Sequence, residues 1–368
     1  MKYQSLIPLA LIFGCVSCSM LPIYTVATSS IATSQFPVAS SLIITFQHTV
    51  TPLPTRLPSA TKEPPKAWKY FGLQGQEVLS IAVNPYNYGE IMAGTENGIY
   101  KLKATMDGWD QLNITGCSPL GPITEIIIDT DSLSTTYAIM NNRLCRSTDS
   151  GSSWKAVYKT TDGDPLKILW FSPFHNTLYT GRAGELVRSE NHGDSWVRVF
   201  WGRKGQTDPS GFTFLLNDPP SIYFWTDGHL FYSPDGYSQW EIRNSSSLPA
   251  LRIIVADVLN SPSTLYAATE IGVLKSLDGG RNWSTVNNGL IDINILSLLM
   301  DYNLSKILYV GTGSDGVYKT INGGASWYQV NNGLSSMIVN VLIPHPLWEN
   351  TIYAGTDDGI FVTSSSAE

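Results

Sequence analysis

Two landmarks recur along the chain in a single phase, and few folds are compatible with such a repeat. Seven of the eleven tryptophans recur at intervals of 41 to 45 residues: Trp68, Trp109, Trp154, Trp196, Trp240, Trp283 and Trp327. A second landmark, nearly always tyrosine, follows each tryptophan by 24 to 28 residues: Met92, Tyr137, Tyr179, Tyr223, Tyr266, Tyr309 and Tyr353. Seven copies of one structural unit are therefore predicted.

Each unit has the pattern of four short strands. In the fifth, 252–257 ("RIIVAD") is an apolar run suited to a buried inner strand, and 264–269 alternates around Tyr266. A turn at 270–272 leads into "VLKS", and a turn at 278–280 leads into "NWSTV". Four strands in about 43 residues is the spacing of a β-propeller blade.

The two ends of the repeat region complement each other. Trp68 has no strands of its own before it, and the last unit, 338–363, has three strands and then stops. The segment around Trp68 is therefore expected to supply the outer strand of the last blade. The predicted fold is all-β, a seven-bladed propeller over residues 67–368 whose ring closes without a long open edge.

A turn phrase precedes most of the landmark tryptophans, with the pattern Ser/Thr-x-Asp-x-Gly-x-x-Trp. The Asp carboxylate can accept hydrogen bonds from backbone N–H groups of its own turn, and the Gly can adopt a positive φ. The Trp can fill the gap between neighbouring blades. The phrase is thus interpreted as structural.

These turns resemble the Asp-box, or BNR repeat, of sialidases, sortilins, xyloglucanases and the photosystem II stability/assembly factor family. The matching positions are Ser147, Asp149, Gly151 and Trp154; Ser189, Asn191, Gly193 and Trp196; Ser276, Asp278, Gly280 and Trp283; Thr320, Asn322, Gly324 and Trp327; and, with Tyr237 in place of glycine, Ser233, Asp235 and Trp240. The turn at Trp109 is degenerate, and the last blade ends before its own. The resemblance implies that these turns lie on the face away from any ligand.

The N-terminus has the pattern of an export signal, predicted over residues 1–23. Lys2 precedes the apolar run 6–13, and "IFGC" at Cys15 resembles the lipobox of bacterial lipoproteins; Cys18, after Ser17, is a competing lipidation site, and an ordinary cleaved signal is the alternative. Residues 24–66 are rich in Ser, Thr and Pro and are expected to form a tether. We therefore expect a protein attached by lipid to the extracytoplasmic side of a bacterial membrane, or secreted, with no other membrane contact.

The net charge and the positions of Cys and His indicate which partners, disulfides and metals to expect. The net charge is −7 and no basic stripe is present, so nucleic acid is not an expected partner. Export permits a disulfide between Cys117 and Cys145. No His or Cys has metal-ligand spacing, and neither a metal nor a cofactor is expected.

Ligand-binding candidates are expected on the upper face, which we define as the turns between second and third strands together with the blade-to-blade connections. Acids recur in these turns, and the longest connection, 200–211, places an aromatic residue beside two cations. The acids have an alternative explanation, since Asp and Glu beside Gly form good hairpin turns. Trp201 could likewise pack on a neighbouring blade instead of binding a ligand. Trp170, in an apolar run, is expected in the core. The candidates are Trp201, Arg203, Lys204, Trp225, Asp227, Glu270, Asp315 and Asp357, with Glu96, Glu185 and Asp358 in the same acidic pattern.

No catalytic residues are predicted. The arginines show no cluster of the kind that a sialidase needs, sialidases have six blades, and xyloglucanases place their site between two propellers. The single seven-bladed domain is most similar to the photosystem II stability/assembly factor family, whose propeller binds a partner protein. The prediction is a monomeric, non-enzymatic scaffold for a protein or glycan. The alternative is a glycoside hydrolase that uses two upper-face carboxylates.

Overall fold

The computed structural model describes residues 67–368, except 86, 88, 118–120, 130, 131, 133, 162, 173–176, 183, 202–208, 216–220, 227, 237, 238, 245, 246, 258–262, 302, 303, 347, 349 and 364–368. The predicted signal, both lipidation candidates Cys15 and Cys18, the tether, and the candidates Arg203, Lys204 and Asp227 lie outside the described residues. The described part of the chain contains no helix long and apolar enough to cross a membrane.

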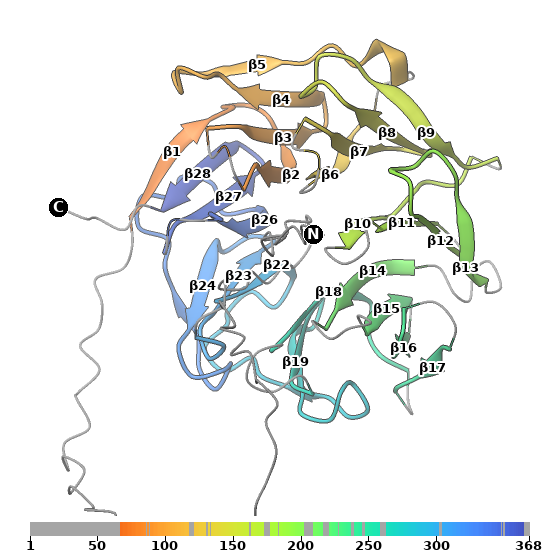
Figure 1. Cartoon of the computed structure of the whole chain (residues 1–368). Coiled ribbons are helices and arrows are strands. Elements are labelled where there is room, and N and C mark those ends of the chain that lie inside the picture. Colours follow the sequence, from red (N-terminus) through yellow and green to blue (C-terminus); the bar gives the residue numbers. More distant parts are fainter. Residues whose placement is uncertain are drawn as a thin grey trace, which may run out of the picture. The chain divides into compact units, whose positions relative to one another are not determined.

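Seven antiparallel sheets of four strands form the predicted propeller (Figure 1). Blade 1 contains β2 (Val78–Val83), β3 (Ile91–Thr95), β4 (Gly98–Leu102) and β5 (Trp109–Gln111). Blade 2 contains β6 (Ile123–Ile128), β7 (Thr136–Met140), β8 (Arg143–Ser147) and β9 (Lys155–Lys159). Blade 3 contains β10 (Ile168–Ser172), β11 (Thr177–Arg182), β12 (Glu185–Ser189) and β13 (Val197–Trp201).

The remaining blades repeat this order from the inner strand outwards. Blade 4 contains β14 (Pro209–Phe214), β15 (Ile222–Thr226), β16 (His229–Ser233) and β17 (Glu241–Ile242). Blade 5 contains β18 (Leu251–Ala256), β19 (Leu265–Thr269), β20 (Gly272–Ser276) and β21 (Ser284–Thr285). Blade 6 contains β22 (Ile295–Met300), β23 (Leu308–Thr312), β24 (Val317–Thr320) and β25 (Tyr328–Gln329). The 3₁₀ turn η1 (Thr115–Cys117) lies in the connection between blades 1 and 2.

Blade 7 closes the ring, as predicted. It contains β26 (Val339–Pro344), β27 (Ile352–Thr356), β28 (Gly359–Thr363) and, from the other end of the repeat region, β1 (Trp68–Gly72). β1 lies beside β28 (Figure 1). The two strands run antiparallel, and Trp68 lies opposite Thr363. The backbone hydrogen bonds of this pair join the first and last segments of the propeller.

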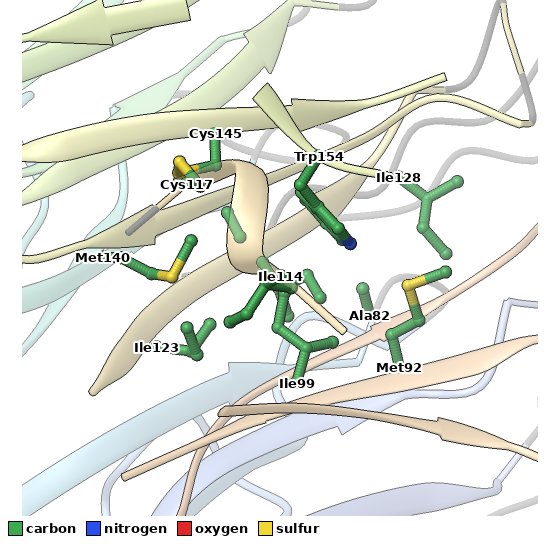
Figure 2. Close-up of a cluster of buried hydrophobic side chains, with 12 residues drawn as sticks. Ala82, Met92, Ile99, Ile114, Cys117, Ile123, Ile128, Met140, Cys145 and Trp154 are labelled. Carbon is green, nitrogen blue, oxygen red and sulfur yellow. A yellow bond between two sulfur atoms is a disulfide. The ribbon is translucent and has the colours of Figure 1, made fainter. Parts of the chain in front are cut away.

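The core consists of clusters that lie between neighbouring blades. Figure 2 shows one of them, in which Met92 and Ile99 of blade 1 pack against Ile123 and Met140 of blade 2, beside Trp154. Most second strands bury both faces in this way and consist mainly of apolar residues, whereas third strands such as β8 and β20 alternate apolar with polar residues. Burial of this kind explains why the landmark tyrosines and tryptophans repeat.

The repeated turn makes the contacts predicted from its residue types. In blade 5, Oδ1 of Asp278 accepts hydrogen bonds from the backbone N–H groups of Arg281 and Asn282, at 3.0 and 2.9 Å. Gly280 has a φ of 87°, and its carbonyl accepts the indole N–H of Trp283 at 3.0 Å. The turn satisfies its own polar groups, which fits the structural interpretation.

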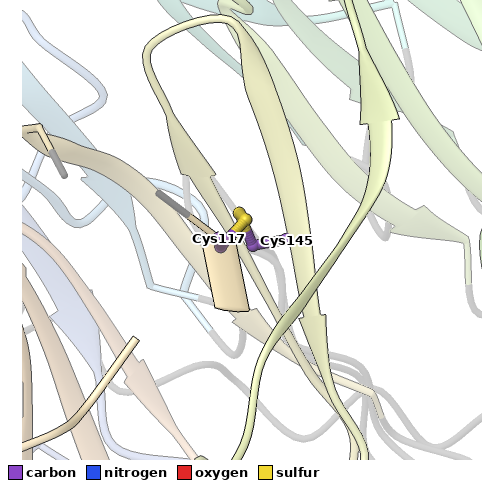
Figure 3. Close-up of a disulfide and its surroundings, with 2 residues drawn as sticks. All are labelled: Cys117 and Cys145. Carbon is purple, nitrogen blue, oxygen red and sulfur yellow. A yellow bond between two sulfur atoms is a disulfide. The ribbon is translucent and has the colours of Figure 1, made fainter. Parts of the chain in front are cut away.

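Cys117 in η1 and Cys145 in β8 are joined by a disulfide, with their Cα atoms 6.2 Å apart (Figure 3). Both residues are fully buried. The disulfide connects the segment that enters blade 2 to the third strand of that blade.

Candidate functional site

The inner strands share a register irregularity near their upper ends. Six of the seven contain it: β2, β6, β14, β18, β22 and β26. In β18 it lies between Leu251 and Ile253, so Arg252 has no paired residue on β19. A bulge of this kind re-aims side chains, and here two or three successive residues of β2, β14, β18, β22 and β26, and Glu125 of β6, reach the centre of the ring.

These residues line a central cavity of about 210 Å³ to which all seven inner strands contribute. A cavity of this size has room for several water molecules or one small chemical group. Its polar lining comes mainly from Glu125, Lys167, Arg252 and Asn340, and its apolar lining includes Leu169, Ile253, Leu298 and Leu342. The cavity therefore has the mixed polar and apolar character of a binding site.

Glu125 is the only acid among the described residues that line the cavity. Its side chain comes from blade 2, the residue is 9% exposed, and Oε2 has no hydrogen-bond partner among the described residues. Desolvation raises the pKa of Glu125 well above its usual value. A buried carboxyl with a free oxygen is a group that a ligand can satisfy.

Lys167 and Arg252 occupy equivalent places, one residue before the regular pairing of their inner strands begins, on blades 3 and 5. Nη1 of Arg252 donates to Oδ1 of Asn294 at 2.7 Å and to the carbonyl of Ile295 at 2.8 Å. Neither cation forms an ion pair with any described residue. Two cations that no described carboxylate pairs with therefore lie at the cavity.

The upper-face acids of blades 5 to 7 lie where the sequence pattern places them, in turns between second and third strands. Glu270 is exposed. Asp315 is half-buried: it accepts hydrogen bonds from the hydroxyl of Tyr318 and, at 2.8 Å, from Nε2 of Gln329. Asp357 is exposed and accepts a hydrogen bond from Ser336.

Two further carboxylates meet where blades 7 and 1 adjoin. Burial raises the pKa of Glu77, and the hydrogen bond and charge of Glu96 and the charge of Asp357 raise it further. Asn340 offsets part of this effect by donating to Oε1 of Glu77 at 3.3 Å. The effect shows that Glu77, Glu96 and Asp357 are close enough to interact.

Two expected surface residues are buried. Trp225 was expected to extend the ligand surface, but it is fully buried, and a Cβ atom on Gly211 would lie 2.0 Å from its ring. Glu185, 4% exposed, pairs with Arg182 and Arg198 at 2.9 and 2.8 Å and is not available to a ligand. Glu185 lies in β12 of blade 3 and Trp225 in β15 of blade 4, and neighbouring residues cover both side chains.

The long connection is only partly described. Trp201 ends β13, where its backbone lies opposite Glu185. Arg203 and Lys204 follow outside the described residues. Trp170 is 3% exposed and belongs to the core, as predicted.

The sequence pattern of turns and connections does not predict the cavity residues, which lie at the start of the inner strands: Glu125, Lys167, Arg252 and Asn340. A signal was present: counted back from each landmark tyrosine, the start of the inner strand carries a polar or charged residue in several repeats. Within the described ranges, no group of three or more His, Cys, Asp or Glu residues could hold a metal ion.

The comparisons with known proteins address the fold. No protein-family model and no curated protein matches the chain. Among solved structures, the GH74 xyloglucanase from Xanthomonas campestris is similar, with a TM-score of 0.63 and 16% identity over 81% of this chain and 53% of that chain. The chain thus spans about half the length of that enzyme.

Two further solved structures with a similar fold come from other kinds of protein. YCF48 from Cyanidioschyzon merolae has a TM-score of 0.60 and 11% identity over 81% of this chain and 98% of its own, and YCF48 is also known bound to a D1 peptide. The extracellular domain of a putative hybrid two-component system from B. thetaiotaomicron has a TM-score of 0.61 and 16% identity over 81% of this chain and 40% of its own. Such identities show the shared seven-bladed fold alone.

Proposed function

We propose that this chain is a non-enzymatic binding scaffold, exported and held at the extracytoplasmic side of a bacterial membrane, that binds a protein or glycan through its upper face. The observation that carries the proposal is the lining of the central cavity. Hydrolysis of a glycosidic bond needs two carboxyl groups about 5–10 Å apart. Among the described residues, the cavity offers one carboxyl, Glu125, together with two cations, which is an arrangement for holding a ligand.

Export, membrane attachment and the nature of the repeated turns are inferred from the sequence. Lipidation at Cys15 or Cys18, the signal over 1–23 and the tether over 24–66 supply export and attachment. We propose that the Ser/Thr-x-Asp/Asn turns are Asp-boxes, which leaves the opposite, upper face for the ligand. A monomer without a metal, cofactor or nucleic-acid partner is part of the same proposal. The D1 peptide bound to YCF48 supports protein binding as a use of this fold.

A second candidate function is glycoside hydrolysis on the upper face. The specific observation in its favour is the contact between Glu77 and Glu96, since a raised carboxyl pKa is a property of a general acid. The similarity to a GH74 enzyme adds to it. In this second case Glu77 would protonate the leaving oxygen.

Binding arrays test the scaffold proposal. The full-length protein, labelled with a fluorophore, is applied to arrays of glycans and of peptides. We expect binding to members of one array, loss of that binding in the double variant Lys167→Ala/Arg252→Ala, and retention in Leu277→Ser. Leu277 is 68% exposed in the turn between β20 and β21, on the opposite face, and so provides the matched control. Absence of binding to both arrays contradicts the proposal.

A further inference from the structure

The connection from blade 5 to blade 6, residues 286–294, spans two upper-face turns. At its start, Nδ2 of Asn287 donates to the carbonyl of Ile271 at 2.9 Å. At its end, the carbonyl of Asn294 accepts from Gly313 at 3.0 Å, and Oδ2 of Asp292 accepts from Ser314 at 2.8 Å. The connection and the two turns therefore form one continuous surface.

This surface exposes four aliphatic side chains. Ile291 is 83% exposed, and Ile293 and Ile271 are 42% and 43% exposed. Met337, 39% exposed, extends the surface to blade 7, because its carbonyl accepts a hydrogen bond from Gly316 at 2.9 Å. We call Ile271, Ile291, Ile293 and Met337 the aliphatic patch. Exposed apolar side chains that gather on one surface indicate an interaction site.

Carboxylates alternate with the patch, and the segments that form the surface carry acids but no cations of their own; Arg252 reaches them from β18 at Asn294. Glu270 precedes Ile271, Asp292 lies between Ile291 and Ile293, and Asp315 and Asp357 lie in the turns of blades 6 and 7. None of these acids forms an ion pair with a described residue. Residues 270–272, 286–294, 313–316, 330–338 and 357–358 contain no Lys or Arg.

The chemistry of this surface selects between the two ligand classes of the proposed function. A glycan is usually held by aromatic faces and hydrogen bonds, whereas aliphatic side chains beside unpaired carboxylates complement apolar and cationic side chains. Resting on the proposed function, we propose that the ligand of the upper face is a protein, and that it docks on the aliphatic patch through a segment that combines apolar side chains with Lys or Arg.

A random peptide library displayed on phage tests this inference with the full-length protein as the target. We expect enrichment of peptides that combine Leu, Ile, Val or Met with Lys or Arg. Selected peptides, made synthetically, should bind the double variant Ile291→Ser/Ile293→Ser about tenfold or more weakly, because two buried aliphatic contacts are lost. Glu270→Lys should weaken binding severalfold, and more at low salt than at high salt.

Matched variants separate docking from unspecific attraction. Leu277→Ser removes an exposed aliphatic side chain from the opposite face and should leave peptide binding unchanged. Enrichment of acidic peptides, no enrichment, or equal binding to the Ile291→Ser/Ile293→Ser variant overturns the inference. Glycan binding that depends on the upper face would overturn it and leave the scaffold proposal standing, whereas absence of both glycan and peptide binding overturns both.

Discussion

The phenolic hydroxyl of Tyr266 donates a 3.2 Å hydrogen bond to the carbonyl of Gly323, in the turn of the next blade. Two other landmark tyrosines do the same: Tyr137 donates to His192 at 3.2 Å and Tyr223 to Gly279 at 3.4 Å. Each accepting residue has a positive φ, between 57° and 71°, which accompanies the placement of its carbonyl towards the preceding blade. The two sequence landmarks are thus joined physically, because the tyrosine of one repeat binds the turn before the tryptophan of the next.

Removal of the Tyr266 hydroxyl tests this link. Lys275 also donates to the Gly323 carbonyl, at 3.1 Å, so one donor remains in Tyr266→Phe. We expect Tyr266→Phe to lower the free energy of unfolding by about 1 kcal/mol. The double variant with Lys275→Met should lose more than the sum of the single variants, since the carbonyl then has no donor from blade 5. Urea denaturation of all four proteins measures the coupling, and strict additivity would contradict it.

Substituting alanine at two glycines distinguishes the cost of a left-handed backbone from the cost of steric crowding. Gly75 has a φ of 75° and nothing within 4 Å of an added Cβ, whereas Gly280 has a φ of 87° and a Cβ there would lie 2.3 Å from Cδ2 of Leu230. Gly75→Ala should cost about 1–2 kcal/mol from the left-handed backbone alone. Gly280→Ala should cost about 1–3 kcal/mol more from overpacking. Thermal unfolding compares the two variants, and an equal loss would argue against close packing at the turn.

The disulfide between Cys117 and Cys145 closes a sequence separation of 28 residues. Chain-entropy arithmetic for a loop of that length predicts a stabilisation of about 3.5 kcal/mol. The variant Cys117→Ala/Cys145→Ala should show that loss in denaturant unfolding under oxidising conditions, and the wild type should approach it when reduced. Intact-mass analysis of exported protein checks the bond directly. Two free thiols there would contradict it.

Glu125 makes stability depend on pH in a defined direction. Its pKa is raised in the folded protein, so below the unfolded pKa, near 4.5, both states are protonated and the residue has no effect. As the pH rises further, the unfolded chain ionises first and the folded state loses relative stability. Glu125→Gln should therefore gain stability relative to wild type between pH 4 and pH 8, measured as the difference in urea midpoint. A difference that does not change with pH would show that the carboxyl is solvated or paired.

The repeat predicted much of the fold, because seven equal units with three strands left at one end allow one simple closure, that of β1 on β28. It could not predict the central cavity. The bulges that turn Arg252 and Glu125 inward depend on how β18 and β6 pair with their neighbours, which no residue type alone reveals. Trp225 shows a second limit: proximity to a turn suggested exposure, but blades cover both faces of a second strand, so burial reaches to its end.

The most direct test of the scaffold account is product release. The full-length protein is incubated with a panel of polysaccharides and chromogenic glycosides, and reducing ends and free chromophore are measured. The account predicts no turnover on any member, for the wild type and for Glu77→Gln and Glu96→Gln alike. Turnover by the wild type that is lost in Glu77→Gln, with its unfolding temperature unchanged, would contradict the account and make the protein a glycoside hydrolase.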